Sequence, residues 1–266
     1  MWALLPQGRR PADIVAIMPL TVPTHPVAVL PAKLRWPRRF DGVALVFGCI
    51  APDVAYAVDG YGVTIHSHAW HAPLWWALPL TLVGARLTRW AAPVVAAHLP
   101  TGGRLALRDY GVLATVRHPW PITGSSALLG AASHLGWDAF THPRVDGGLV
   151  LFPVLHHPVP LVGLAWWQLL MMGSDLIGAV AAIALVLRVG RARLLVAWHG
   201  AVPPVVPRPA RFWPAVAAVL VIGLATLPAQ PVRSFPDQAI RCLLIVGLAL
   251  LAGAFAGRRA ASADGP

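Results

Sequence analysis

The segment SHLGWDAFTH, residues 133–142, holds the side chains best suited to chemistry in this chain. His134, Asp138 and His142 recur every four residues, so on an α-helix they share one face, with neighbours about 5–6 Å apart. Pro143 follows, and because the residue before a proline disfavours helical backbone, the helix is expected to end near His142. Neutral imidazoles and ionised carboxylates together suit Zn²⁺, Mn²⁺ or Fe²⁺. The spacing therefore predicts a divalent-metal site, most typically for Zn²⁺, at a helix end.

The composition indicates the elements that position this site. The 266 residues are 57% hydrophobic and only 12% charged, whereas soluble domains carry roughly a quarter charged residues and need a polar surface. We therefore expect an all-α, polytopic membrane bundle embedded in a lipid bilayer. The formal net charge of +11 comes from arginine clusters between apolar runs, a pattern typical of membrane orientation, and we predict no nucleic-acid partner.

The acidic residues also exclude some chemistry. All ten are Asp, and neither Glu nor Asn occurs in the chain. The metalloprotease motif H-E-x-x-H and the deaminase motif H-x-E both require Glu and are therefore excluded. Any carboxylate chemistry in this protein must come from Asp.

Six apolar runs are candidates to cross a bilayer, which takes roughly 20 residues each: 43–58, 72–97, 121–137, 159–187, 212–229 and 239–257. The fourth run is long and could be one tilted helix, or a re-entrant piece that breaks at residues 173–175. Basic residues gather in alternate gaps between runs, and such gaps face the cytoplasm. This pattern predicts about six spans with both termini cytoplasmic.

Two further apolar segments carry polar groups. Asp53 comes late in the first run, and His68 lies just before the second. In the predicted orientation both face the external side, at the level of Asp138 and His142. Ionisable groups within spans are costly and usually mark function, so three distant segments are expected to converge on one site.

The leading hypothesis is a membrane hydrolase with a bound divalent metal. Asp53, His68, His134 and Asp138 would hold the ion, with the two Asp as catalytic carboxylates and a spare Asp or His as general base. Arg144 would bind an anionic group of a lipid or phosphoester substrate. Two alternatives stay open. The cluster could carry protons or metal ions, or His–Asp pairs could simply lock helices together in a structural or assembly protein.

Five segments carry a family resemblance: MPLT (18–21), HPVAVLP (25–31), GCIAPD (48–53), SH (67–68) and GAASHLGWDAFTH (130–142). Over roughly residues 18–190, the chain resembles a bacterial integral-membrane family catalogued as domain of unknown function 4184. That family is similar to membrane-bound metal-dependent hydrolases. The resemblance implies the bacterial inner membrane as location, and implies metal ligation by six positions: His25, Asp53, His68, His134, Asp138 and His142.

The resemblance leaves two questions. Met171 and Asp175 replace the Gln and Ser typical of the family's fourth run, so no role is carried over to that segment. His25 precedes the first run, toward the cytoplasm. Either it is not a ligand, or segment 18–32 is re-entrant, which we favour.

The expected organisation has five parts. They are an N-terminal extension or misplaced start (1–17), the family-like membrane domain with the metal site (18–190), an Arg/Pro-rich cytoplasmic linker (191–211), two additional transmembrane helices (212–257) and a polar tail (258–266).

Overall fold

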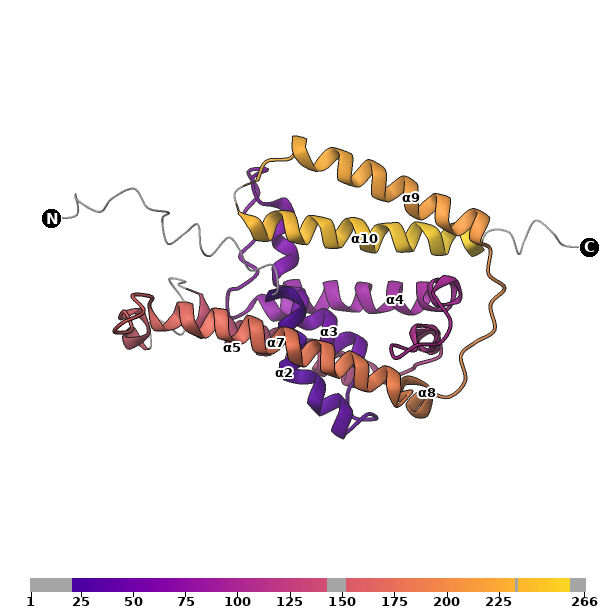
Figure 1. Cartoon of the computed structure of the whole chain (residues 1–266), viewed down its shortest axis with the longest axis horizontal. Helices are drawn as coiled ribbons and strands as arrows, with labels where there is room; N and C mark the ends of the chain where they lie inside the picture. Colours follow the sequence, from indigo (N-terminus) through magenta and orange to yellow (C-terminus); the bar gives the residue numbers. More distant parts are fainter. Residues whose placement is uncertain (1–20, 143–151, 233, 259–266) are drawn as a thin grey trace, which may run out of the picture.

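The protein, described by a computed structural model over residues 21–142, 152–232 and 234–258, is a bundle of helices (Figure 1). Within these residues the only β-pairing is an isolated bridge between Pro158 and Ala165, so the all-α prediction is confirmed for this part of the chain. The α-helices are α2 (Thr21–Arg35), α3 (Gly42–Ile50), α4 (Leu78–His98), α5 (Trp120–Thr141), α7 (Trp166–Arg191), α8 (Leu194–His199), α9 (Pro209–Thr226) and α10 (Phe235–Arg258). The short helices are η1 (Asp53–Val58), the π-turn η2 (Pro73–Ala77), η3 (Leu107–Ala114), η4 (Pro153–His156) and η5 (Leu227–Ala229).

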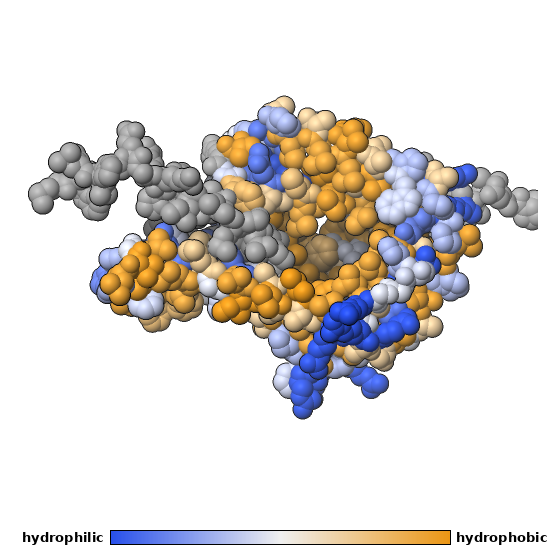
Figure 2. Space-filling view, viewed as in Figure 1, coloured by the Kyte–Doolittle hydropathy of each residue, from blue (hydrophilic) through white to orange (hydrophobic). Residues whose placement is uncertain are grey.

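Three described helices are long and apolar enough to cross a membrane: α7, α9 extended by η5, and α10. Each exposes large aliphatic side chains, such as Ile177 and Val180 on α7, Ile222 on α9 and Leu248 on α10. Figure 2 shows this apolar surface. Side chains of this kind are stable on the outside of a protein when they face lipid, which is consistent with a membrane location.

The described residues do not support six spans. The first predicted span, 43–58, contains α3, whose nine residues extend only about 14 Å, half of a bilayer core; the chain then continues as η1. In the fourth run, α7 passes residues 173–175 without a break, so the alternative of a re-entrant piece there is wrong. The predicted re-entrant segment at 18–32 is also unsupported, because its described part belongs to the 15-residue helix α2.

Glycines let the helices beneath the site cross closely. A Cβ on Gly48 of α3 would lie 2.3 Å from the carbonyl oxygen of Ala127, and one on Gly130 of α5 would lie 2.4 Å from that of Leu45. These distances leave no room for a side chain, as in other contacts built from small residues. The crossing sets α5 beside the carboxyl end of α3, where Asp53 follows.

A second close contact brings α2 into the bundle. A Cβ on Gly178 of α7 would lie 2.5 Å from the Cβ of Thr24. The neighbouring residue, His25, is buried with 5% of its surface exposed. Packing against α7 thus positions α2, and with it His25, at the site.

Asp41 ties three helices together. Its carboxylate caps α3 by accepting from the backbone N–H groups of Val43 and Ala44, as N-cap aspartates do. It also accepts hydrogen bonds from Arg89 of α4 and from Thr123 of α5. A fully buried carboxylate is stable only when it is neutralised and hydrogen-bonded in this way.

The side chain of Lys33 lies beside this carboxylate. Its ammonium donates to the carbonyls of Pro37 (2.6 Å) and Phe40 (2.8 Å). Burial lowers the pKa of Lys33 to about 8; the negative charge of Asp41 opposes the shift, and the positive charge of Arg89 adds to it.

The arginine-bearing ends of the candidate spans lie together, toward the right of Figure 1. The backbone N–H of Arg208, just before α9, donates to His98 at the end of α4 (2.8 Å). Arg258, at the end of α10, donates to the Trp90 carbonyl of α4. Gly190, at the end of α7, packs on the backbone of Arg104. One end of the bundle is therefore the basic end.

We predict that Gly130→Ala destabilises the protein by about 1–3 kcal/mol, because overpacking a tight contact costs that much. Gly136→Ala on the same helix is the control. A Cβ there meets no atom within 4 Å, so the change should be neutral or stabilising by up to about 1 kcal/mol. Tryptophan-fluorescence melting in detergent measures both variants; equal behaviour would contradict the close crossing.

We also predict a pH effect from Lys33. Between pH 8 and the ordinary lysine pKa of 10.5, the unfolded chain binds the Lys33 proton and the folded protein has released it. The protein should therefore gain stability as pH rises across this window. The melting temperature of the wild type minus that of Lys33→Met should increase from pH 8 to 10. A difference that stays flat or falls would show that Lys33 keeps an ordinary pKa.

Candidate metal centre

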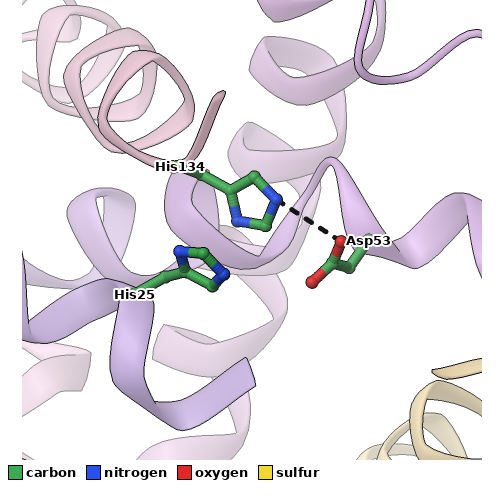
Figure 3. A group of neighbouring side chains, drawn as sticks. All are labelled: His25, Asp53 and His134. Atoms are coloured by element: carbon green, nitrogen blue, oxygen red, sulfur yellow. Dashed lines mark ion pairs between the residues drawn. The ribbon is translucent and has the colours of Figure 1, made fainter. Parts of the chain in front are cut away.

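Six polar side chains meet where four segments converge. His25 comes from α2, Asp53 from the first residue of η1, His68 from the loop before η2, and His134 and Asp138 from α5. His142 joins them from the C-cap of α5. Figure 3 shows His25, Asp53 and His134 pointing toward one another. The i, i+4 spacing along α5 thus has the predicted effect, and the helix ends where Pro143 led us to expect.

Four ligand atoms form the centre of this cluster: Nε2 of His68, Nε2 of His134, Oδ1 of Asp53 and Oδ2 of Asp138. We call them the four-atom group. The two nitrogens are 3.3 Å apart. The Asp53 oxygen lies 3.3 Å from the His68 nitrogen and 3.4 Å from that of His134. The Asp138 oxygen lies 3.5 and 3.4 Å from the same two nitrogens.

These distances fit the faces of a tetrahedral coordination shell. Nitrogen and oxygen ligands lie about 2.0–2.1 Å from Zn²⁺, and the corners of such a tetrahedron are therefore about 3.3–3.4 Å apart. Five of the six distances within the four-atom group lie between 3.3 and 3.5 Å. The two carboxylates belong to separate triads of ligand atoms that lie within 4.8 Å of one another, namely His25, Asp53 and His134, and His68, His134 and Asp138. The donor set, two imidazoles and two carboxylates, is also one that binds Zn²⁺, Mn²⁺ or Fe²⁺.

The second oxygen of Asp138 faces a different pair of histidines. Oδ1 lies 3.6 Å from Nε2 of His25 and 3.3 Å from Nδ1 of His142. One carboxylate therefore joins an inner layer of ligand atoms to an outer pair of imidazoles. Outer groups of this kind orient metal ligands in other proteins.

The interior of the cluster has unmet hydrogen-bonding capacity. Nε2 of His25 and Nδ1 of His134 are buried without a hydrogen-bond partner among the described residues. Burial, strengthened by the neighbouring His134, lowers the pKa of His25 to about 4. His25 is therefore a neutral imidazole at physiological pH, which is the form that binds metals. The orphaned nitrogens and the donor set together fit a bound cation.

His68 is held in place by its surroundings. The hydroxyl of Ser67 is hydrogen-bonded to Nδ1 of His68 at 3.1 Å, which leaves Nε2 for the four-atom group. Trp76 donates to the Ala51 carbonyl at 2.9 Å, fastening the segment after His68 to the end of α3. The loop thus presents this histidine in a fixed orientation.

Arg241 of α10 supports the other side of the loop. Its guanidinium donates to the carbonyls of Ala57 (3.0 Å), Asp59 (2.5 Å) and Pro231 (2.6 Å). Arg241 was not among the predicted site residues, although it is the single cation inside the last apolar run, 239–257. A charge in such a run was the available signal.

A cavity of about 500 Å³ opens beside His68. Polar groups on its wall include Asp59, His66 and His71, and Tyr56, Ile65 and Trp75 add apolar surface. His68 also lines this cavity, so it connects outside space with the four-atom group. The lining is amphipathic.

Other candidate residues lie elsewhere. Arg144, the predicted substrate-binding residue, falls outside the described residues. His156 and His157 are exposed and make no described contact with the cluster. Asp175 is buried in the middle of α7.

The comparisons identify a family. A family model described as Domain of unknown function (DUF4184) matches residues 18–257, which extends the resemblance beyond residue 190 to include α9 and nearly all of α10. No curated protein and no solved structure matches the chain.

Proposed function

Because the chain belongs to the DUF4184 family, whose description assigns no activity, we propose from its own geometry that it is a membrane-embedded, metal-dependent hydrolase. The observation that carries this proposal is the four-atom group. Within it, His68, His134 and Asp138 form a triad whose three distances, at 3.3–3.5 Å, match one face of a tetrahedral coordination shell and leave the fourth position for water. The amphipathic cavity beside His68 supports it, because a hydrolase needs a place for substrate next to the ion.

In this proposal the ligands of one divalent cation come from Asp53, His68, His134 and Asp138, with Zn²⁺ as the first candidate and Mn²⁺ or Fe²⁺ as alternatives. Three of them would hold the ion, as the triad His68, His134 and Asp138 could, and the fourth position would stay open for water. Such a cation makes water a nucleophile near neutral pH. The two carboxylates offset its charge in a buried setting. His25 and His142 hold the second oxygen of Asp138, and so fix the direction in which that carboxylate points.

His142 is the best placed general base. It contacts Asp138 at 3.3 Å and keeps 30% of its side chain exposed, whereas His134 is fully enclosed. A proton accepted at the imidazole of His142 can therefore pass to solvent. The hydroxyl of Thr141 is hydrogen-bonded to the same ring at 3.0 Å and restrains it.

The substrate class follows from the cavity and its surroundings. Trp75 and Ile65 favour an apolar part of the substrate, while His66 and His71 favour a polar or anionic part. An amphiphile, such as a lipid or another phosphoester, combines these features. Arg144 remains the proposed partner of its anionic group.

We predict that the protein purified without added metal contains about one equivalent of zinc, manganese or iron, and that the double variant His134→Ala, Asp138→Ala has lost it. Elemental mass spectrometry measures the content. The double variant His156→Ala, His157→Ala is the control, since it removes two side chains that can bind a metal, both exposed and outside the cluster, and should retain the metal.

Chelator should lower the melting temperature of the wild type to that of His134→Ala and leave the variant unchanged, because a ligand lost from the folded state removes its stabilisation. Equal loss of stability in His134→Ala with and without chelator, and no metal in the wild type, would favour helix-locking hydrogen bonds. Transport of protons or metal ions in vesicles that depends on Asp53 would favour a carrier.

The reaction itself is tested on the metal-loaded protein with a panel of lipid and phosphoester substrates. We expect Asp138→Ala to lower product release by at least about a hundredfold, the low end of what a lost acid–base or electrostatic group removes. Product release that is absent in both proteins, or identical in both, would refute the hydrolase proposal while leaving the metal site intact.

We also propose that the protein lies in the inner membrane of a bacterial cell, with the basic end of the bundle facing the cytoplasm. The gathering of Arg208, Arg258 and the carboxyl end of α7 at that end supports this, since cytoplasmic ends of spans carry the excess of arginine. A reporter fused after Pro266 should therefore read as cytoplasmic. An external reading at the C-terminus would overturn the orientation.

A further inference from the structure

A second cavity lies at the basic end of the bundle, between the loop after α4 and the carboxyl end of α7. Its volume is about 490 Å³. The loop contributes Thr101, Gly102, Gly103, Arg104, Ala106, Arg108 and Asp109, and the α7 side contributes Gly190, Arg191 and Arg193. We call it the arginine cavity.

The charge in this cavity is unbalanced. Four of its ten lining residues are arginines, and Asp109 is the one carboxylate among them. Asp109 is buried and already engaged by Arg193 through two hydrogen bonds, of 2.8 and 2.5 Å. Arg104, Arg108 and Arg191 therefore face the same space with no carboxylate of the lining left to neutralise them.

The backbone of the cavity is unusual as well. Gly102 and Gly103 have φ of +77° and +75°, and a Cβ at either would meet nothing within 4 Å. Ala106 and Arg193 also have positive φ, of 46° and 48°, and they are two of the three non-glycine residues with that conformation in the described chain. Side chains adopt it at a cost in energy, and such residues cluster where ligands bind.

The loop is nevertheless firmly seated. A Cβ at Gly190 would lie 2.4 Å from the carbonyl oxygen of Arg104, so α7 and the loop touch backbone to backbone. Arg108 donates from Nε to the Leu99 carbonyl at 3.0 Å, which leaves its terminal nitrogens for other partners. This backbone contact fixes the loop that carries Arg104 beside the end of α7 that carries Arg191, so the two exposed arginine side chains line one cavity.

We propose that the arginine cavity binds a phosphate group. Guanidinium groups form paired hydrogen bonds with phosphate oxygens, and the unbalanced positive charges match its negative charge. Because α7 is a candidate span that ends at this cavity, the expected source is the headgroup of an anionic phospholipid, bound as in other basic pockets at the ends of membrane helices. A soluble phosphate compound is the other possible source.

This site is separate from the proposed metal centre. Gly178 of α7 packs beside Thr24, next to His25, whereas Gly190 lies twelve residues further along the same helix. At 1.5 Å per residue the two positions are about 18 Å apart. The proposal therefore stands or falls independently of the hydrolase activity.

The test uses the full chain in a neutral detergent, with phosphatidylglycerol, phosphatidylcholine and inorganic phosphate as probes. Apparent affinities come from the rise in melting temperature on titration, followed by tryptophan fluorescence. The double variant Arg104→Gln, Arg191→Gln changes two cavity arginines that make no described hydrogen bond. Arg86→Gln, Arg211→Gln is the control, with the same loss of charge at exposed positions outside the cavity.

We expect the wild type to bind phosphatidylglycerol more tightly than phosphatidylcholine, and the cavity variant to bind it at least about tenfold more weakly, as loss of charge-assisted hydrogen bonds predicts. The control should bind like the wild type. The double variant Arg104→Lys, Arg191→Lys keeps the positive charges but loses the planar guanidinium groups that form paired hydrogen bonds with phosphate. It should therefore recover only part of the affinity.

Two other outcomes would change the source of the phosphate or contradict the proposal. If only inorganic phosphate distinguishes the cavity variant from the control, the phosphate site is real and its source is soluble. If the two glutamine variants weaken binding equally, or neither does, the arginines act only as general positive charge at the membrane surface and the proposal is wrong. A cavity variant whose melting temperature without probe has collapsed is replaced by the single variant Arg191→Gln, judged by the same criteria.

Discussion

The structure depends above all on the need to compensate the buried carboxylate of Asp138. The residue is 3% exposed, and an ionised carboxylate in such a place is unstable unless other groups neutralise it. Its two oxygens meet four imidazoles, those of His68 and His134 on one side and of His25 and His142 on the other. Three segments, which lie up to 117 residues apart in sequence, therefore share one electrostatic requirement, and a cation in the four-atom group would satisfy it most completely. The convergence of these segments in the fold therefore also assembles the site.

Two other buried carboxylates, those of Asp41 and Asp109, are compensated by arginine side chains. Asp41 is neutralised by Arg89 and accepts a hydrogen bond from Thr123 where α3 begins, and Asp109 is neutralised by Arg193 at the basic end. In each of these two cases an arginine supplies a permanent positive charge. Imidazoles are the described ion-pair partners of Asp53 and Asp138. Unlike a guanidinium, an imidazole can also bind a metal ion in its neutral form.

The convergence of the site was predictable from sequence because it rests on local spacing. The four-residue interval between His134, Asp138 and His142 fixes a helix face, and Pro143 marks its end. Asp53 and His68 stood out as polar residues in apolar surroundings. The number of spans was not predictable in this way. A run such as 43–58 scores as apolar whether it faces lipid or packs against α5, and the close contact through Gly48 that buries it involves a partner about 80 residues away. Arg241 was missed for the same reason, since its role is defined by carbonyls nearly 200 residues earlier in the chain.

Helix α7 connects the two proposed sites, and its residues explain how one helix can serve both. Near its middle, Gly178 admits α2 and so positions His25. At its end, Gly190 admits the loop that carries Arg104. Between these two glycines the helix exposes Val180, Ile183 and Val186, a surface suited to lipid. Helices in a bilayer approach their neighbours most closely at small residues, and at these two glycines α7 packs directly on α2 and on the loop. The proposed metal centre lies near the first contact and the arginine cavity at the second, so a lipid held by its phosphate in the cavity would lie along the same helix that supports the proposed centre.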